Sequence, residues 1–346
     1  MNVVLHIGTE KTGTSTLQQF LFKNRQELLN SGVYVPTSPL GPDAPSHLKL
    51  AVYGRNDSRP QADVNLKFGI RTLAHFRAQF AEEFLAECSA AQAQTIVMSS
   101  EHCSSRLNNP DEVCRLREFL ERIGETTVLV YLRRQDQLLT SSYATKVRLG
   151  SAEPLKLPTD PVFLRNFYDY QHLCDLWSRA FGKDNLKVRI YSSKEFVDGD
   201  LLHDYLASCG FSVDLSKCKV PAPQNESLDL QYLEFLRRFN VWLPNMGRHT
   251  NFLRDPRQGN LIQTLDRLAK GQKLSLPPDK ADAFLAQFEQ GNQYVARAYL
   301  GREDGRLFEP PSRGDNVAAE WSMSLDDAFR LFAEVWAEAN QPPKVA

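Results

Sequence analysis

The segment HIGTEKTGTST at residues 6–16 joins a short strand to a helix and constrains the fold of this chain more than any other feature. Residues 2–7 are rich in β-branched and apolar side chains and too few for a helix, so they predict a buried strand. Gly8 and Gly13 bracket a turn, and from Thr14 apolar residues recur at helical spacing. A strand, a loop and a helix in this order open a parallel βαβ unit, which predicts an α/β protein.

The alternation of strands and helices continues along the chain. Further strands are predicted at 33–36, 95–100, 126–132 and 186–191, and helices at 68–92, 111–123, 135–149, 163–181, 199–209, 228–239, 280–299 and 324–338. We therefore expect a three-layer sandwich around a mostly parallel sheet, with a mostly helical C-terminal part. Residues 1–220 are predicted to form the core and 221–346 a helical region packed on it. Turn-forming residues at 37–65 predict a long loop near a substrate site.

The first loop nearly matches the P-loop pattern, in which two glycines separated by four residues are followed by Lys and then Ser or Thr. Here Thr14 takes the position of that Lys, and Lys11 lies inside the loop. Backbone N–H groups before a helix N-terminus suit an anionic oxygen cluster. Side-chain donors are also available from Lys11, Thr12, Thr14, Ser15 and Thr16. The alternative is a plain turn in which Thr14 caps the helix.

Two other strands are predicted to end in polar side chains. Arg133 and Arg134 follow the strand at 126–132, and arginine can hold a phosphate through two parallel hydrogen bonds. Ser141 lies on the helix that follows. Because ligands of open α/β sheets bind beyond the carboxyl ends of the strands, these residues are candidates for a phosphate site. Pairing of the two arginines with surface acids is the competing interpretation.

Glu101 and His102 come directly after the strand predicted at 95–100. A carboxylate or an imidazole at a strand end can serve as a general base. A helix cap or a solvent-facing polar turn would use the same residue types. The sequence alone leaves both interpretations open.

These segments together resemble the sulfotransferases that use 3′-phosphoadenosine-5′-phosphosulfate (PAPS). The 5′-phosphosulfate loop of that family carries Lys, a small or hydroxyl residue, Gly-Thr and a further hydroxyl or Arg, and this chain reads Lys11-Thr12-Gly13-Thr14-Ser15-Thr16. The 3′-phosphate motif has Arg at a strand end, Ser eight residues later and Tyr two residues after that. Arg133, Ser141 and Tyr143 match it. The resemblance covers residues 1–150, and it implies a P-loop NTPase-like sheet.

The resemblance also implies an activity, which is in-line transfer of a sulfuryl group from PAPS to an acceptor hydroxyl or amine without a metal ion. Lys11 and the loop up to Thr16 would stabilise the charge that develops on the leaving phosphate. Arg133 and Ser141 would hold the 3′-phosphate and position the cofactor. The expected acceptor is a carbohydrate, a glycolipid or a small alcohol.

For the base, the family offers Glu in its carbohydrate-modifying branch and His in its small-molecule branch. Glu101 is preferred because the ending Ser-Ser-Glu resembles the carbohydrate-type and bacterial branch, and His102 is the alternative. Residues 225–228 are weakly similar to a later family segment, and the basic stretch at 247–251 could close over the adenine.

Composition and charge indicate which kinds of binding partner the sequence does not favour. A net charge of −1 gives no indication of a surface for nucleic acid or anionic membranes. The six cysteines show no CxxC or zinc-ligand spacing, so we expect reduced thiols and no metal. The chain begins with a strand and contains no apolar run of membrane length, and we expect a cytoplasmic enzyme. The rival functions are a P-loop kinase and a non-catalytic nucleotide-binding protein of the same fold.

Overall fold

The computed structural model of the chain describes residues 1–41, 45–56, 72–221, 228–243, 256–268, 273–310 and 323–339. Two compact units are present. The first contains Met1–Arg133, Thr159–Gln224 and Phe288–Glu309, and the second contains Arg134–Pro158, Asn225–Gln287 and Pro310–Ala346. The division at residue 220 stays a prediction about domains, and the compact units follow other boundaries. Residues 225–227 and 247–251, which the resemblance singled out, lie outside the described residues.

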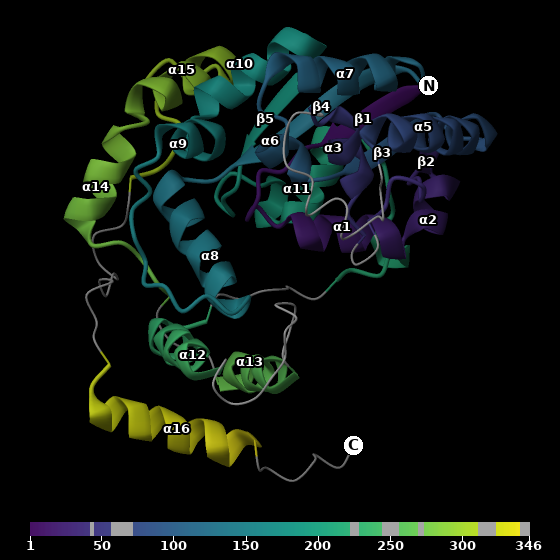
Figure 1. Cartoon of the computed structure of the whole chain (residues 1–346). Helices are drawn as coiled ribbons and strands as arrows, with labels where there is room; N and C mark the ends of the chain where they lie inside the picture. The colour runs from purple at the N-terminus through teal and green to yellow at the C-terminus, as the bar shows by residue number, and fades with distance from the viewer. Residues whose placement is uncertain are drawn as a thin grey trace. The chain divides into compact units, whose positions relative to one another are not determined.

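A five-stranded parallel sheet forms the centre of the first unit (Figure 1). Its strands lie in the order β2-β3-β1-β4-β5. Their bounds are β1 Asn2–His6, β2 Val33–Tyr34, β3 Thr95–Ser99, β4 Glu125–Leu132 and β5 Leu186–Ile190. Since β1 pairs in parallel with β3 on one side and with β4 on the other, the loops that follow these three strands meet at one edge. The predicted α/β class and parallel sheet are confirmed.

Helices cover both faces of this sheet, which explains why its strands are nearly continuous apolar runs. One face packs against α3 (Leu48–Gly54), α5 (Leu73–Ala90), α6 (His102–Arg106), α7 (Pro110–Glu121), α10 (Tyr170–Phe181) and α15 (Glu289–Leu300). The other packs against α1 (Thr14–Lys23), α2 (Arg25–Asn30) and α11 (Leu201–Cys209). The unit also contains α9 (Pro161–Tyr168), η1 (Val197–Gly199) and η2 (Leu215–Lys217). The three predicted layers are present.

The predicted loop at 37–65 is wrong in its middle, where residues 48–54 form α3. Leu50 and Ala51 are buried in the core of the sheet face that α5 and α7 cover. The turn-forming residues lie outside this run, and its apolar side chains are close enough together to form a short buried helix. Residues 42–44 and 57–65 of the predicted loop lie outside the described residues.

The helix predicted at 163–181 is divided in two. Asp169 accepts a hydrogen bond from the backbone N–H of His172 at 2.9 Å and so caps the start of α10. The helix predicted at 280–299 is also two helices, of which α14 (Pro278–Ala286) belongs to the second unit and α15 to the first. Helical periodicity continued across both breaks, so the sequence pattern did not reveal them.

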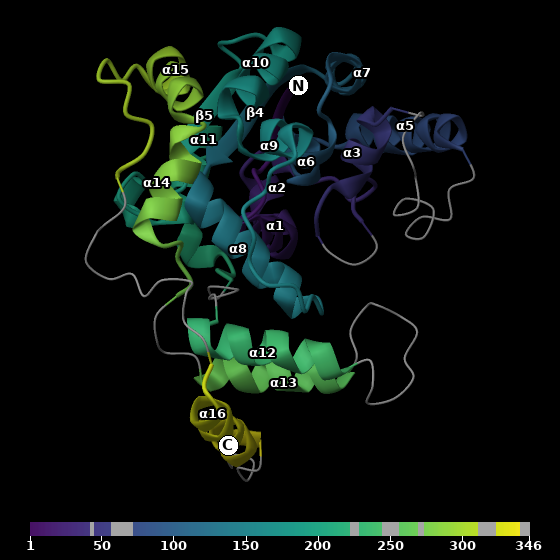
Figure 2. The same ribbon diagram turned by 60° about the vertical axis from the view of Figure 1, so that its left-hand side comes forward.

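The second unit is helical throughout its described part, apart from an isolated bridge between Asp229 and Lys273. It contains α8 (Gln135–Arg148), α12 (Leu230–Trp242), α13 (Pro256–Leu268), α14 and α16 (Leu325–Ala339). α12 and α13 lie side by side (Figure 2). Leu236, Leu265 and Leu331 from α12, α13 and α16 share one buried core. The predicted helical C-terminal part is confirmed, although α13 was not predicted.

Candidate active site

The loop after β1 is held at its beginning by β4. The N–H of Ile7 donates to the carbonyl of Leu129 at 2.9 Å, and the N–H of Tyr131 donates to the carbonyl of Gly8 at 2.7 Å. Thr9 donates to the carbonyl of Tyr131 through its N–H at 2.9 Å and through its hydroxyl at 3.0 Å. These bonds continue the parallel pairing past the end of β1, so the loop leaves the sheet directly beside β4.

Two glycines let other segments approach the loop more closely than a side chain would allow. Gly8 has φ 103°, and a Cβ atom there would lie 3.0 Å from the Cα atom of Glu101. Gly13 has φ 74°, and its Cβ atom would overlap the side chain of Leu201 on α11. Glycine is therefore required at both positions for backbone conformation and for space.

Lys11 is the only residue between these glycines with a left-handed backbone, at φ 64°. Such a conformation is uncommon for a residue with a side chain and persists where the surroundings fix it. Thr12 is completely buried, and its hydroxyl donates to the carbonyl of Thr9 at 2.7 Å. That hydroxyl closes the loop on itself, so the Thr12 side chain already donates its hydrogen within the loop.

Gly13 occupies the N-cap position of α1, and Thr14 is the first helical residue, so Thr14 does not cap the helix as the plain-turn alternative required. Among the described residues no side chain caps this helix. The N–H groups at the start of a helix have no partner within the helix and carry a partial positive charge. Ser15 is exposed and Thr16 half-buried at this end. The first turn of α1 can therefore donate to an anionic group.

Arg133 follows β4 directly and contacts the loop after β1. Its Nη1 donates to the main-chain carbonyl of Lys11 at 2.8 Å. Its guanidinium carbon lies 5.5 Å from the centre of the Tyr191 ring, within the range of a cation–π contact. The hydroxyl of Tyr170 donates to the carbonyl of Arg133. The structure thus brings together Lys11 and Arg133, two cations that are far apart in the sequence.

Arg134 belongs to the second unit and has a different environment. Its Nε and Nη2 donate to the two carboxylate oxygens of Asp136 at 2.7 Å and 3.0 Å. Ion pairing with an acid, which competed with phosphate binding for both arginines, is therefore found for Arg134. Ser141 and Tyr143 lie on α8, also in the second unit, and the predicted partnership of Ser141 with Arg133 stays a prediction.

Glu101 lies at the end of β3, beside the same loop. The N–H of Ser100 donates to the carbonyl of His6 at 2.9 Å, which ties this strand end to β1. Glu101 occupies the N-cap position of α6, and its Oε2 accepts a hydrogen bond from Nε2 of Gln18 on α1 at 2.5 Å. His102 is half-buried as the first residue of α6. The carboxylate is therefore held against α1 through Gln18, the fifth residue of that helix.

Two buried histidines support the strand end that carries Glu101. Nδ1 of His47 accepts the N–H of Ser99 at 3.0 Å, and its Nε2 lies 3.1 Å from the carbonyl oxygen of Pro36. Nδ1 of His6 lies 2.8 Å from the hydroxyl of Ser99. Burial lowers the pKa of His47 to about 4 and that of His6 to about 3. Both rings are therefore neutral at physiological pH and act as hydrogen-bonding supports.

Several residues of this site were not predicted from the sequence. Gln18 lies four residues after Thr14 on α1, so helical spacing places it on the face above the first turn, and this signal could have been used. Tyr191 directly follows β5, and the strand-end rule applied to β4 could have been extended to it. Tyr170 begins a helix that lies far along the chain, and its position carries no local signal.

No protein-family model matches the chain. An uncharacterized protein of Archaeoglobus fulgidus is 29% identical over 203 residues, which cover 57% of this chain and 52% of that protein. The chain thus spans about half the length of this curated relative.

A crystal structure of a sulfotransferase from Alicyclobacillus acidocaldarius matches 72% of this chain and 97% of its own, with 15% sequence identity and a TM-score of 0.39. Among the described residues, no helix combines the length and the apolar character needed to cross a bilayer.

Proposed function

We propose that this chain is a sulfotransferase that moves a sulfuryl group from PAPS to an acceptor hydroxyl or amine. The observation that supports it most is the 2.8 Å hydrogen bond from Arg133 to the carbonyl of Lys11. The guanidinium of Arg133 therefore contacts the loop that carries Lys11, and two cationic residues in one region would suit a donor with phosphate groups at two positions. The uncapped start of α1 adds backbone donors beside them. This set of donors fits a multiply charged nucleotide.

Lys11 is assigned to the 5′-phosphate of the donor, which is the leaving group when the sulfuryl group is transferred to the acceptor. The left-handed backbone of Lys11 sets the direction in which its side chain leaves the loop, and its ammonium group would stabilise the charge on the leaving phosphate. Electrostatic stabilisation of this kind is usually the largest single contribution to catalysis. Arg133 is assigned to the 3′-phosphate. Its contacts with Tyr191 and with the loop carbonyl restrict its rotamers, so less side-chain freedom is lost when an anion binds.

Glu101 is assigned as the general base. It would accept the proton of the acceptor while the acceptor oxygen or nitrogen bonds to sulfur and the bond from sulfur to the phosphate oxygen breaks. Gln18 holds Oε2 of this carboxylate, and among the described residues no hydrogen bond engages its Oε1. His102 is the alternative base from the same strand end. A carbohydrate or glycoconjugate hydroxyl is the proposed acceptor, on the resemblance of the Ser-Ser-Glu ending to the carbohydrate branch.

The donor site is tested by binding of the product, 3′,5′-bisphosphoadenosine, compared with Mg-ATP. A ligand at a hundred times its Kd that binds only the folded protein adds about 2.7 kcal/mol of stability, which a thermal-shift assay detects. We expect the bisphosphate to stabilise the protein strongly and Mg-ATP to have little effect. Arg133→Ala should weaken bisphosphate binding at least tenfold, because a charged hydrogen-bonding partner is lost.

Arg134→Ala is the matched control, since Asp136 already engages that guanidinium, and its affinity for the bisphosphate should stay within twofold of the wild type. Stabilisation by Mg-ATP alone would indicate a kinase. Equal losses in the Arg133 and Arg134 variants would remove the specific role of Arg133. Turnover with PAPS and a panel of hydroxyl acceptors then tests catalysis, where Lys11→Ala should lower kcat by about a hundredfold to a thousandfold. Full turnover in Glu101→Gln combined with His102→Asn would refute the assignment of the base.

A further inference from the structure

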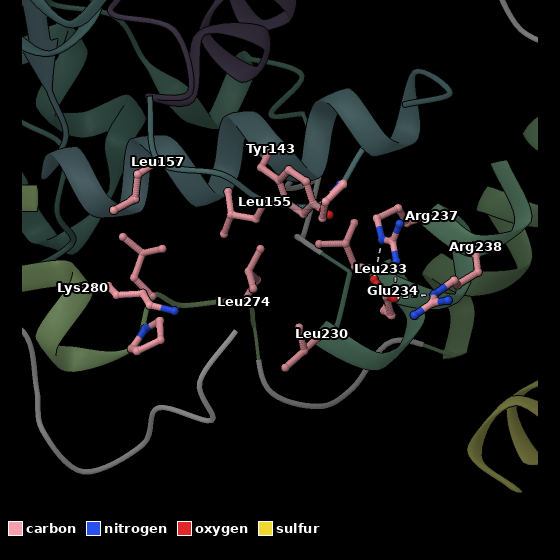
Figure 3. A pocket seen from close by; sticks show the side chains of 13 residues that line it. Tyr143, Leu155, Leu157, Leu230, Leu233, Glu234, Arg237, Arg238, Leu274 and Lys280 are labelled. Carbon is pink, nitrogen blue, oxygen red and sulfur yellow. Dashed lines mark hydrogen bonds and ion pairs between the residues drawn. The ribbon is translucent and has the colours of Figure 1, made fainter. Parts of the chain in front are cut away.

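A cavity of about 400 Å³ lies entirely within the second unit (Figure 3). Its walls come from α8, α12, the start of α14 and the segments that precede α9 and α14. Leucines and prolines make up most of the lining, and the leucines are Leu155, Leu157, Leu230, Leu233, Leu274 and Leu276. The volume lies within the range of about 300–1,000 Å³ that is usual for small-molecule sites. Lys11, Glu101, Arg133 and Ser141 do not line it, whereas Tyr143, which matched the 3′-phosphate motif, does.

The polar groups of this cavity are few and are placed at its ends. Figure 3 shows the leucines between Lys280 on one side and Glu234, Arg237 and Arg238 on the other. Nε of Arg237 and Nε of Arg238 donate to the Glu234 carboxylate at 2.6 Å and 2.8 Å. Two guanidinium groups thus lie at one end of the cavity and the Lys280 ammonium at the other, so each end has a cationic side chain that can attract an anionic group. Arg238 is 59% exposed, which leaves its charge accessible from solvent.

The lining favours one class of ligand over others. A sugar or a peptide would place several hydroxyl or amide groups against leucine side chains, and each buried polar group without a partner carries a cost. The hydroxyl of Tyr143 is a single polar group among these walls, and burial raises its pKa, so it stays neutral. An unbranched alkyl chain has no polar groups to satisfy and gains from leaving water.

We propose that this cavity binds an amphiphile with one unbranched alkyl chain and an anionic head group. The chain lies among the leucines, and the head group lies at one of the two basic ends. The proposal does not depend on sulfuryl transfer. The chemistry of the ligand is that of a fatty acid or of an alkyl sulfate.

Binding of octanoate, decanoate and dodecanoate, measured by titration calorimetry below their micelle concentrations, tests the proposal. Each added methylene that enters the cavity should tighten binding about fourfold, until the chain fills the available length. The heat-capacity change should be negative, as expected for burial of apolar surface. An affinity that does not change with chain length would overturn the proposal.

A variant that fills the cavity and a matched control test whether the fatty acid binds there. Figure 3 shows Leu155 and Leu157 directed into the cavity, and Lys156 between them is 74% exposed. Leu155→Trp should therefore fill the cavity and weaken decanoate binding at least tenfold, whereas Lys156→Trp adds the same indole outside and should change it less than twofold. Leu157→Trp serves if Leu155→Trp does not fold. Equal affinities in the blocking and control variants would overturn the site.

The head group is tested with decanol and with variants of the basic ends. Decanoate should bind more tightly than decanol, and Arg238→Ala or Lys280→Ala should weaken decanoate about threefold to tenfold while leaving decanol unchanged. Equal binding of the acid and the alcohol would refute the anionic head group. No nucleotide is present in these titrations, so they succeed or fail independently of the bisphosphate experiment that tests the proposed function.

Discussion

Replacement of Gly13 by alanine should destabilise the protein strongly, for two reasons that can be separated. The left-handed backbone at φ 74° costs an L-residue about 1–2 kcal/mol. The new Cβ atom would also overlap Leu201 and lie 3.2 Å from Cε2 of Tyr191. Forcing an additional carbon into a packed region costs about 1–3 kcal/mol. Together these terms predict a loss of about 2–5 kcal/mol in the free energy of unfolding.

A double-mutant cycle separates the two contributions. Leu201→Ala removes the carbon atom that the new Cβ would overlap and leaves the backbone of Gly13 unchanged. In that background Gly13→Ala should cost only about 1–2 kcal/mol, the part that comes from the left-handed conformation. The difference between the two backgrounds is the coupling free energy between positions 13 and 201.

Urea unfolding of the four proteins, followed by circular dichroism, measures these free energies if the m-values agree. Addition of 3′,5′-bisphosphoadenosine to each protein then shows whether a strained loop still binds its ligand. A neutral Gly13→Ala variant would refute the left-handed loop. An equal cost of Gly13→Ala in both backgrounds would refute the close approach of α11 to the start of α1, and with it the packing argument for this glycine.

Two further predictions concern the residues behind the site. Because burial lowers the pKa of His47 to about 4 and of His6 to about 3, the unfolded chain binds more protons than the folded one below pH 6.5, so stability should fall from that pH toward pH 4. Near pH 5 each ring adds up to about 1.4 kcal/mol per pH unit to the slope of the unfolding free energy against pH. His47→Gln should remove one of these contributions, as measured by urea unfolding at several pH values. An unchanged slope in this variant would contradict the burial of His47. Gln18→Leu should lower kcat about tenfold through loss of a hydrogen bond to the Glu101 carboxylate, with unchanged bisphosphate affinity; a fall in affinity alone would argue against a role beside the base.

The sequence predicted the sheet well because its signals are local. Apolar runs at 2–7, 95–100 and 126–132 are rich in β-branched residues and are bounded by turn residues, and each forms a strand. The loop at 37–65 was predicted less well, because its composition was averaged over a stretch that contains a short buried helix. A helix such as α3 depends on the core that receives it, and that core is assembled from distant segments.

The sequence by itself determined which residues stand at the strand ends. Parallel strands end at the same edge of a sheet, so the sequence predicts that Lys11, Glu101 and Arg133 lie near one edge. Only the tertiary structure decided which partners hold these side chains. Gln18 donates a hydrogen bond to Glu101, and Arg133 donates to the carbonyl of Lys11. Arg134, in contrast, forms an ion pair with Asp136. These contacts depend on which face of the sheet each helix covers and on how closely other segments approach the loop at its glycines. Both depend on packing between distant segments, so a local sequence pattern does not encode them.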